Sequence, residues 1–204
     1  MSGERVVLRP IANPLPLGFV GLAAATLVVS GLQLGWLPDS EGSNVALVLI
    51  AFVFPLQLVT CIFGLLGRDV VAATGMGILA GTWLSVGLVS LTSAPGSTSD
   101  ALGLFLLLAG AAMLIPAIGA MASKLVAAAV LATTAIRFAT TGLYELTAKP
   151  VWADVAGVVG LALCALALYG ALAMALEDAG AAFVLPIGRR GSDRGAEPGV
   201  RDQL

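Results

Sequence analysis

The stretch that decides the fold is Asn13-Pro14-Leu15-Pro16-Leu17-Gly18, which leads directly into the apolar run of residues 19–29 (FVGLAAATLVV). Proline fixes its own φ and biases the preceding residue away from helix, so the two prolines predict a helix that begins at or just after Pro16. The apolar run predicts a membrane span over about residues 16–36. The stretch is therefore expected to form a rigid elbow at the mouth of a transmembrane helix.

The composition of the chain places it in the membrane class. Apolar residues make up 59% of its 204 residues and charged residues 11%, whereas soluble domains carry about 25% charged residues. Runs of about 20 apolar residues, enough to cross a hydrocarbon core about 30 Å thick, recur between short polar breaks. The sequence predicts an all-α, polytopic membrane protein with six transmembrane helices in one bundle.

The later spans are predicted over residues 44–66, 70–92, 101–122, 125–144 and 155–176. They form a membrane domain over residues 14–188, preceded by a cytoplasmic leader (1–13) and followed by a disordered cytoplasmic tail (189–204). Arginine and lysine collect in the leader, the second and fourth loops and the tail, whereas the opposite face holds Lys149. The positive-inside rule therefore predicts cytoplasmic N- and C-termini, in the plasma or inner membrane of the cell.

The residues present argue against catalysis, metal binding and nucleic-acid binding. The chain has no histidine, and its sequence contains neither a metal-ligand motif nor a phosphate-binding glycine loop. A net charge of −2 gives no reason to expect a nucleic-acid partner. Cys61 and Cys164 lie in apolar runs, where the expected role is that of a small buried hydrophobe. We expect no enzyme activity, no cofactor and no metal.

Two spans carry residues that alter helix packing. Pro55 and Gln57 would bend the second span and leave a backbone carbonyl without a partner, which fits either a helix that lines a cavity or a packing kink. Gly77 and Gly81 form a small-xxx-small face in the third span, which suits close approach of another helix.

The fifth span contains a charged residue, Arg137, roughly 20 Å along the helix from Lys124. An arginine inside the apolar slab is costly unless it snorkels, pairs or faces water. One hypothesis is that Arg137 attracts an anion on the outer half of a permeation path. The alternatives are a snorkelling side chain and an ion pair with Glu145. The spans carry no carboxylate near their centres, which argues against a pump with its own proton relay.

Asn13 also permits two interpretations. The free N–H groups at the start of a helix, together with its partial positive end, favour anions, so Asn13 and the first turn could hold a small carboxylate. An asparagine at this position equally suits a helix cap and entry turn.

The residues 13–18 (NPLPLG) and 184–188 (VLPIG), with Trp83 and Tyr169, resemble the acetate uptake transporter family, which includes the bacterial succinate-acetate permeases. The hallmark of that family is NPAPLG at the entry to the first of six spans, and this chain differs from it at one position. The resemblance implies transport of acetate and related short carboxylates such as succinate, either proton-coupled or channel-like. It further implies ring-shaped hexamers in the bilayer, each protomer with its own pore. It assigns substrate binding to Asn13, Pro14, Pro16, Leu17 and Gly18.

The resemblance also implies an apolar constriction in the pore. Where the family has a phenylalanine in the first span and a tyrosine in the third, this chain has Leu22 and Leu79. The leucine of the fifth span falls at Leu131 or Ala132, and Arg137 has no identified counterpart. We expect a divergent member with a differently shaped, still hydrophobic constriction. The competing interpretation is an oligomeric membrane scaffold without transport, in which side chains fill the space of the path.

Overall fold

The computed structural model describes residues 12–122, 124–179 and 185–188. Its helices are α1 (Leu15–Gln33), α2 (Gly42–Val48), α3 (Phe54–Leu66), α4 (Val70–Thr92), α5 (Asp100–Met121), α6 (Leu125–Thr147) and α7 (Pro150–Asp178), with a 3-10 turn η1 (Asp39–Glu41) and a π-helical turn η2 (Leu49–Val53). The elements from η1 to α3 follow one another as a single span, which gives six helices long and apolar enough to cross a membrane. The predicted fold class is thereby confirmed. The predicted tail, and the leader up to residue 11, lie outside the described residues.

The span boundaries agree best where the sequence carries a clear cap. The third span was predicted over 70–92 and α4 occupies those residues, capped by Asp69, whose side chain accepts a hydrogen bond from the Ala72 N–H. The sixth span begins earlier than predicted, because Pro150 occupies the first turn of α7, where its missing N–H is harmless. The fifth span ends later, at Thr147, and Ala148 (φ 51°) stops it in the left-handed conformation.

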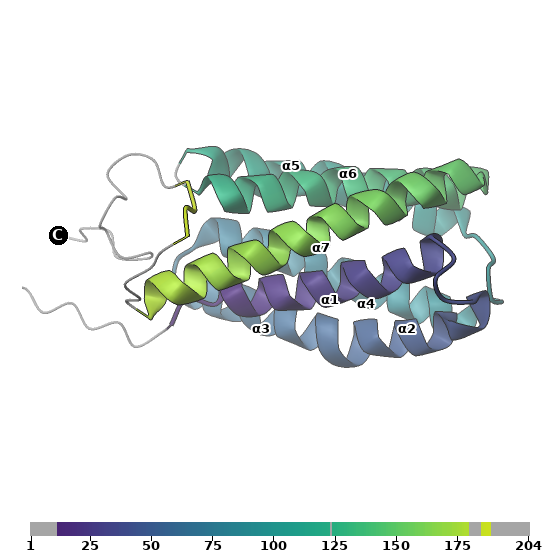
Figure 1. The fold of residues 1–204 in the computed structure, drawn as a ribbon, viewed down its shortest axis with the longest axis horizontal. Helices are drawn as coiled ribbons and strands as arrows, with labels where there is room; N and C mark the ends of the chain where they lie inside the picture. The colour runs from purple at the N-terminus through teal and green to yellow at the C-terminus, as the bar shows by residue number, and fades with distance from the viewer. Residues whose placement is uncertain (1–11, 123, 180–184, 189–204) are drawn as a thin grey trace, which may run out of the picture.

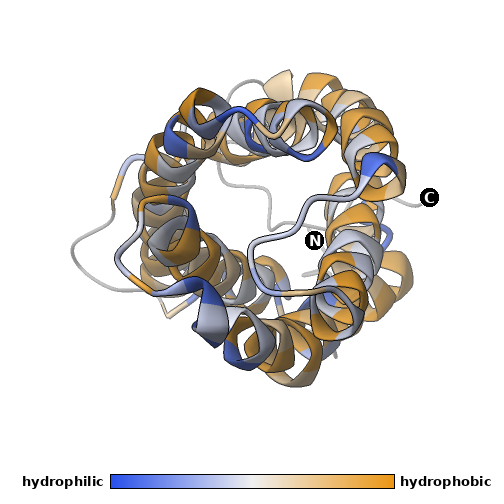
Figure 2. Cartoon of the chain, turned by 90° about the vertical axis from the view of Figure 1, so that its right-hand side faces the viewer, coloured by the Kyte–Doolittle hydropathy of each residue, from blue (hydrophilic) through white to orange (hydrophobic). Residues whose placement is uncertain are grey.

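The six spans form a closed ring in chain order. Each span packs against the next one in the sequence, and α7 returns to pack along α1. Figure 1 shows α7 crossing α1, with α5 and α6 on one side of the bundle and α3 on the other. Viewed along the long axis, the ribbons surround a central region (Figure 2). Helix α1 begins and α7 ends at the same end of the bundle (Figure 1).

The interior and the outer surface of the ring are both apolar. One contiguous cluster of buried hydrophobic side chains draws on every span, and it includes Phe19, Leu79 and Met113. The outer face of α5 carries four large apolar side chains that are each more than 60% exposed: Leu104, Leu108, Ile115 and Ile118. Such a surface is expected of a protein surrounded by lipid.

The second span changes helix type directly before Pro55. Proline has no N–H and cannot bond the carbonyl one turn earlier, and the π-helical turn η2 immediately precedes it, at Leu49–Val53. Helix α4 approaches this turn closely, because a Cβ added to Gly87 would lie 2.7 Å from Ile50 Cγ1 and 3.1 Å from the Ala46 carbonyl oxygen. The predicted irregularity is therefore a local change of helix type against which α4 packs.

Candidate substrate path

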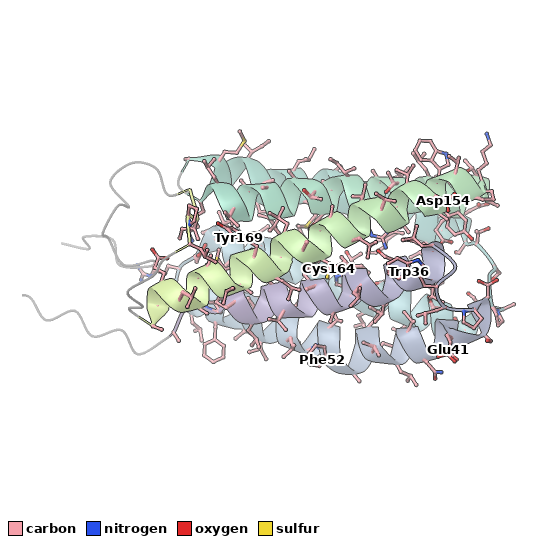
Figure 3. The ribbon with its side chains drawn as sticks, viewed as in Figure 1. Trp36, Glu41, Phe52, Asp154, Cys164 and Tyr169 are labelled. Carbon is pink, nitrogen blue, oxygen red and sulfur yellow. The ribbon has the colours of Figure 1, made fainter. Side chains whose placement is uncertain are left out.

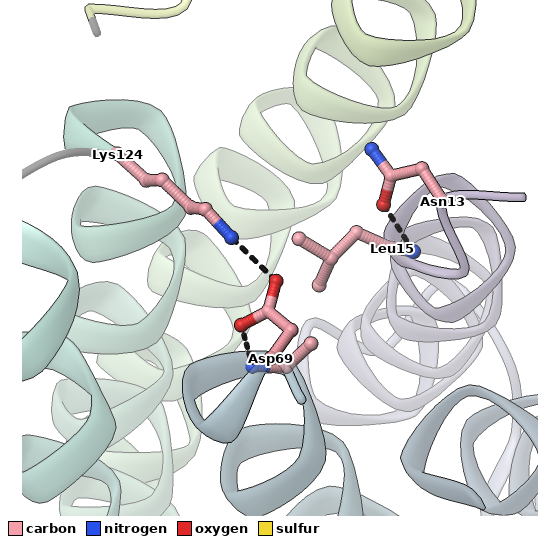
Figure 4. Close-up of polar contacts among 5 residues, drawn as sticks. Asn13, Leu15, Asp69 and Lys124 are labelled. Atoms are coloured by element: carbon pink, nitrogen blue, oxygen red, sulfur yellow. Dashed lines mark hydrogen bonds and ion pairs between the residues drawn. The ribbon is translucent and has the colours of Figure 1, made fainter. Parts of the chain in front are cut away.

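The motif of residues 13–18 begins α1. The Asn13 side-chain oxygen accepts a 3.1 Å hydrogen bond from the Leu15 N–H, as Figure 4 shows. This bond satisfies one of the free donors of the first turn, so the cap interpretation of Asn13 is realised in the structure.

At the motif, α1 packs closely against α3 and α4. A Cβ on Gly18 would lie 2.5 Å from Met76 Sδ and 2.9 Å from Thr60 Cγ2. The Thr60 hydroxyl lies 2.8 Å from the Leu56 carbonyl oxygen and 3.3 Å from that of Pro14. Gly18 is thus required for close packing, and Thr60 ties the elbow to α3.

The remaining motif residues are distributed differently. Pro16 is half-buried, whereas Leu17 is 40% exposed on the outer surface of the protomer. The structure therefore does not bring Leu17 together with the interior residues expected to line a path.

Residues 185–188, from the second motif of the sequence (VLPIG), pack against the start of α6. The Tyr169 hydroxyl donates a 2.8 Å hydrogen bond to the Pro186 carbonyl oxygen. The N–H groups of Leu125 and Val126 donate to the carbonyl oxygens of Gly188 (3.4 Å) and Ile187 (3.3 Å). Residues 185–188 thus satisfy first-turn donors of α6 that would otherwise lack partners.

An ion pair lies at the same end of the bundle. Lys124, just before α6, pairs with the carboxylate of Asp69 that caps α4 (Figure 4). The pair joins the turn after α5 to the turn before α4.

The predicted constriction residues lie inside the ring. Leu22 and Leu79 are 0% exposed and Leu131 is 2% exposed, while Ala132 is half-buried. Leu131 reaches α4, since a Cβ on Gly75 would lie 2.9 Å from its Cδ2. Leu22, Leu79 and Leu131 are thus packed among other side chains in this conformation.

Aromatic side chains join the leucines in the interior, which the sequence analysis did not foresee. Phe19 packs against α7, because a Cβ on Gly170 would lie 3.0 Å from its ring. Trp83 and Phe138 form an edge-to-face pair with ring centroids 5.6 Å apart. The sequence did carry a signal for them, because residues three, four or seven positions apart share a helix face. Phe19 and Trp83 lie one turn from Leu22 and Leu79, and Phe138 lies two turns from Leu131.

A vestibule of about 600 Å³ opens at the other end of the bundle. Its charged lining residues are all acidic: Asp39, Glu145 and Asp154. Figure 3 labels Asp154, with Trp36 and Glu41, at this end, and Figure 2 views the ring from it. Deeper lining residues include Gln33 and Thr141.

Arg137 is buried within the ring and is 1% exposed. Its Nη1 donates a 2.9 Å hydrogen bond to Thr141 Oγ1, while Nε and Nη2 have no hydrogen-bond partner among the described residues. Glu145 instead accepts a 2.8 Å hydrogen bond from the Ser99 N–H. Both alternatives for Arg137, a snorkelling side chain and an ion pair with Glu145, are therefore wrong for the described part of the chain.

Other buried polar atoms lack partners within the described residues. They are Ser30 Oγ, Gln33 Oε1, Trp83 Nε1 and both amide atoms of Gln57. Gln57 was recognisable in the sequence from its place beside Pro55, and Ser30 carried a visible signal too, as a lone serine in the apolar first span.

Comparison with known proteins agrees with this architecture. The sequence matches the GPR1/FUN34/yaaH family over residues 2–189. A solved structure described as the bacterial acetate channel SatP is similar with a TM-score of 0.76 and 24% sequence identity, over 87% of this chain and 99% of that one. Among curated proteins none matches. The resemblance seen in the sequence is confirmed: with six helices long and apolar enough to cross a membrane, the chain belongs to the GPR1/FUN34/yaaH family.

Proposed function

We propose that this protein conducts acetate and related short carboxylates along the axis of its helix ring. The observation that carries the proposal is the buried Arg137, a cation without an acidic partner among the described residues, inside the ring of a member of this family. A buried charge of this kind is stabilised by an ion of opposite sign. The structural likeness to a bacterial acetate channel supports the same class of substrate.

The path runs from the vestibule past Arg137 and the apolar interior to the motif at the start of α1. Along α1 the distance from Ser30 to Leu22 is about 12 Å. Between the levels of Ser30 and Leu22 the lining is apolar. It suits the methyl group of acetate, whereas the carboxylate loses hydrogen bonds there. We assign the gate to Leu22, Leu79, Leu131 and Ala132, whose side chains must move to open it.

The far mouth is assigned to the motif. Asn13, Pro14, Pro16 and Gly18 shape the entry, and the outward Leu17 holds it from the lipid side or against a neighbouring protomer. We further propose cytoplasmic termini, placement in the plasma or inner membrane, and a homo-oligomer, a hexamer by family resemblance. Succinate as a second substrate and proton coupling belong to the same proposal.

Uptake of radiolabelled acetate into vesicles reconstituted with the purified oligomer tests the proposal. We expect saturable flux that unlabelled carboxylates of two to four carbons inhibit, and measurements at two pH values separate proton coupling from passive passage. Absence of flux for every one of these carboxylates, in a correctly folded oligomer, would refute it.

The closed interior favours one competing function, a membrane scaffold without transport. Leu22 and Leu79 have no exposed surface, and Gly81 faces outward with no atom within 4 Å of an added Cβ. A scaffold would assemble through such small outward faces. In that case Gly81→Leu would disrupt the oligomer, and the native protein would show no acetate flux.

A further inference from the structure

We propose that Arg137 and Ser30 form a buried carboxylate-binding site directly beneath the floor of the vestibule, with Gly160 leaving room for both side chains. Its role in transport rests on the function proposed above, whereas its ability to bind a carboxylate does not. The three residues come from different helices, α6, α1 and α7.

The unpartnered part of Arg137 is the part that recognises carboxylates. In a planar guanidinium, Nε and Nη2 share one edge, and their two parallel N–H donors match the two oxygens of a carboxylate. Both of these nitrogens lack partners, whereas Nη1 is held by Thr141 at 2.9 Å. The Thr141 hydroxyl also donates to the Arg137 carbonyl oxygen at 2.9 Å, which fixes the anchor to the same helix.

Gly160 lies against the Nε end of the guanidinium, with Ser30 beside it. A Cβ added to Gly160 would lie 2.7 Å from Arg137 Nε and 3.1 Å from Cζ, and would also clash with Ser30 Oγ. Ser30 is 0% exposed and its hydroxyl has no partner among the described residues. The hydroxyl lies beside the same glycine as Arg137 Nε and is free to donate, so we assign it a third hydrogen bond to a carboxylate on Arg137.

A weak contact separates this site from the vestibule. Gln33 and Thr141 both line the vestibule, and Gln33 Nε2 lies 3.5 Å from Thr141 Oγ1. Arg137 does not line the vestibule but donates to Thr141, which does, so Arg137 and the adjacent Ser30 and Gly160 lie behind this floor. A hydrogen bond of that length is weak, so turning the Gln33 side chain aside opens the site at little cost.

The acidic wall of the vestibule makes the site selective by geometry. Asp39, Glu145 and Asp154 repel anions, so negative charge alone does not draw a ligand into the vestibule. A carboxylate is instead selected by the directed hydrogen bonds that Arg137 donates to its two oxygens. A neutral isostere such as acetamide has one oxygen in place of two, so it cannot accept hydrogen bonds from both Nε and Nη2 of Arg137 in the same way. The site is therefore expected to bind acetate and to reject acetamide.

Binding of sodium [¹³C]acetate to the purified protein in detergent, followed by NMR titration, tests the site without requiring flux. Arg137→Gln should weaken acetate binding at least about tenfold, since it removes two charge-assisted hydrogen bonds to the carboxylate. Arg137→Lys retains the charge but not the fork and should be intermediate. Ser30→Ala should weaken binding by a smaller factor.

A second variant leaves the arginine in place. Gly160→Ala puts a methyl group against Arg137 Nε and Ser30 Oγ, which must shift to admit it, and should also weaken binding about tenfold, even if Arg137→Gln fails to fold. Gly81→Ala, which meets open space, and Lys124→Gln, at the far end of the bundle, are controls expected to bind acetate like the wild type.

The outcomes separate this inference from the proposed function. Acetate binding that depends on Arg137 and Gly160, without flux, would support the site and refute transport. Flux with unchanged acetate affinity in folded Arg137→Gln or Gly160→Ala protein would refute the site and leave transport standing. Equal competition by acetamide, or no acetate binding by the wild type, would also overturn the site.

Discussion

The Nη1 group of Arg137 donates a 2.9 Å hydrogen bond to the hydroxyl of Thr141, one turn further along α6. The arginine is thus folded along its own helix and does not extend to the surface. This local bond leaves two of its nitrogens without partners inside the ring, within the described residues.

The first prediction concerns that bond. Thr141→Val preserves the shape of the side chain but leaves Nη1 without a partner, so we expect a loss of about 1–3 kcal/mol in stability and weaker acetate binding. Unfolding in detergent and the acetate titration measure the two effects. Thr134→Val is the matched control, because that buried hydroxyl bonds the Val130 carbonyl oxygen on the same helix and no charged group. Equal effects on acetate binding in both variants would contradict the prediction.

The second prediction concerns Gly18. Gly18→Ala places a methyl group 2.5 Å from Met76 Sδ, so we expect a destabilisation of about 1–3 kcal/mol from overpacking. Thermal unfolding in detergent measures it. Gly81→Ala should be neutral or slightly stabilising, because nothing lies within 4 Å and alanine favours the helix. A Gly18→Ala protein as stable as wild type would show that α1, α3 and α4 can separate without cost.

The third prediction concerns Gln57, which is 0% exposed and has no partner for its amide among the described residues. Gln57→Leu removes an unsatisfied polar group at similar volume, so we expect it to stabilise the protein by about 1–3 kcal/mol. We also expect slower acetate flux, because the interior loses a polar group that a passing carboxylate can contact. A destabilised variant would mean that the amide is hydrogen-bonded in the native protein.

The fourth prediction concerns the clamp at residues 185–188. Tyr169→Phe removes the 2.8 Å hydrogen bond to Pro186 and should cost about 1 kcal/mol. Hydrogen exchange should rise at the Leu125 and Val126 amides, which donate to this segment. The Val130 amide, deeper in α6, is the internal reference. Unchanged exchange at all three positions would show that the segment is held without Tyr169.

Helix number and position could be predicted from sequence because length and apolarity decide which segments cross a membrane. Caps sharpened the boundaries where a side chain had one obvious role, as Asp69 does before α4. Pro150 was misassigned to a loop because a proline both breaks helices and begins them, and only the packing of α7 decides between these roles.

The candidate site was harder to predict. The sequence indicated that Arg137 is exceptional, but not that its side chain bonds Thr141 and leaves Glu145 to the Ser99 amide. Ser30 and Gly160 are far apart in the chain and become neighbours because α7 packs along α1. Periodicity within one helix carries no information on which residues of another helix it meets.

The π-helical turn at Leu49–Val53 has a consequence for comparing this chain with its relatives. A wide turn of this kind holds one residue more than an α-helical turn. Against a relative whose second helix is regular, a correct alignment therefore needs a one-residue gap within this turn. An ungapped alignment would rotate every assignment on one side of it by about 100° around the helix axis, and so exchange residues that face the ring interior for residues that face lipid.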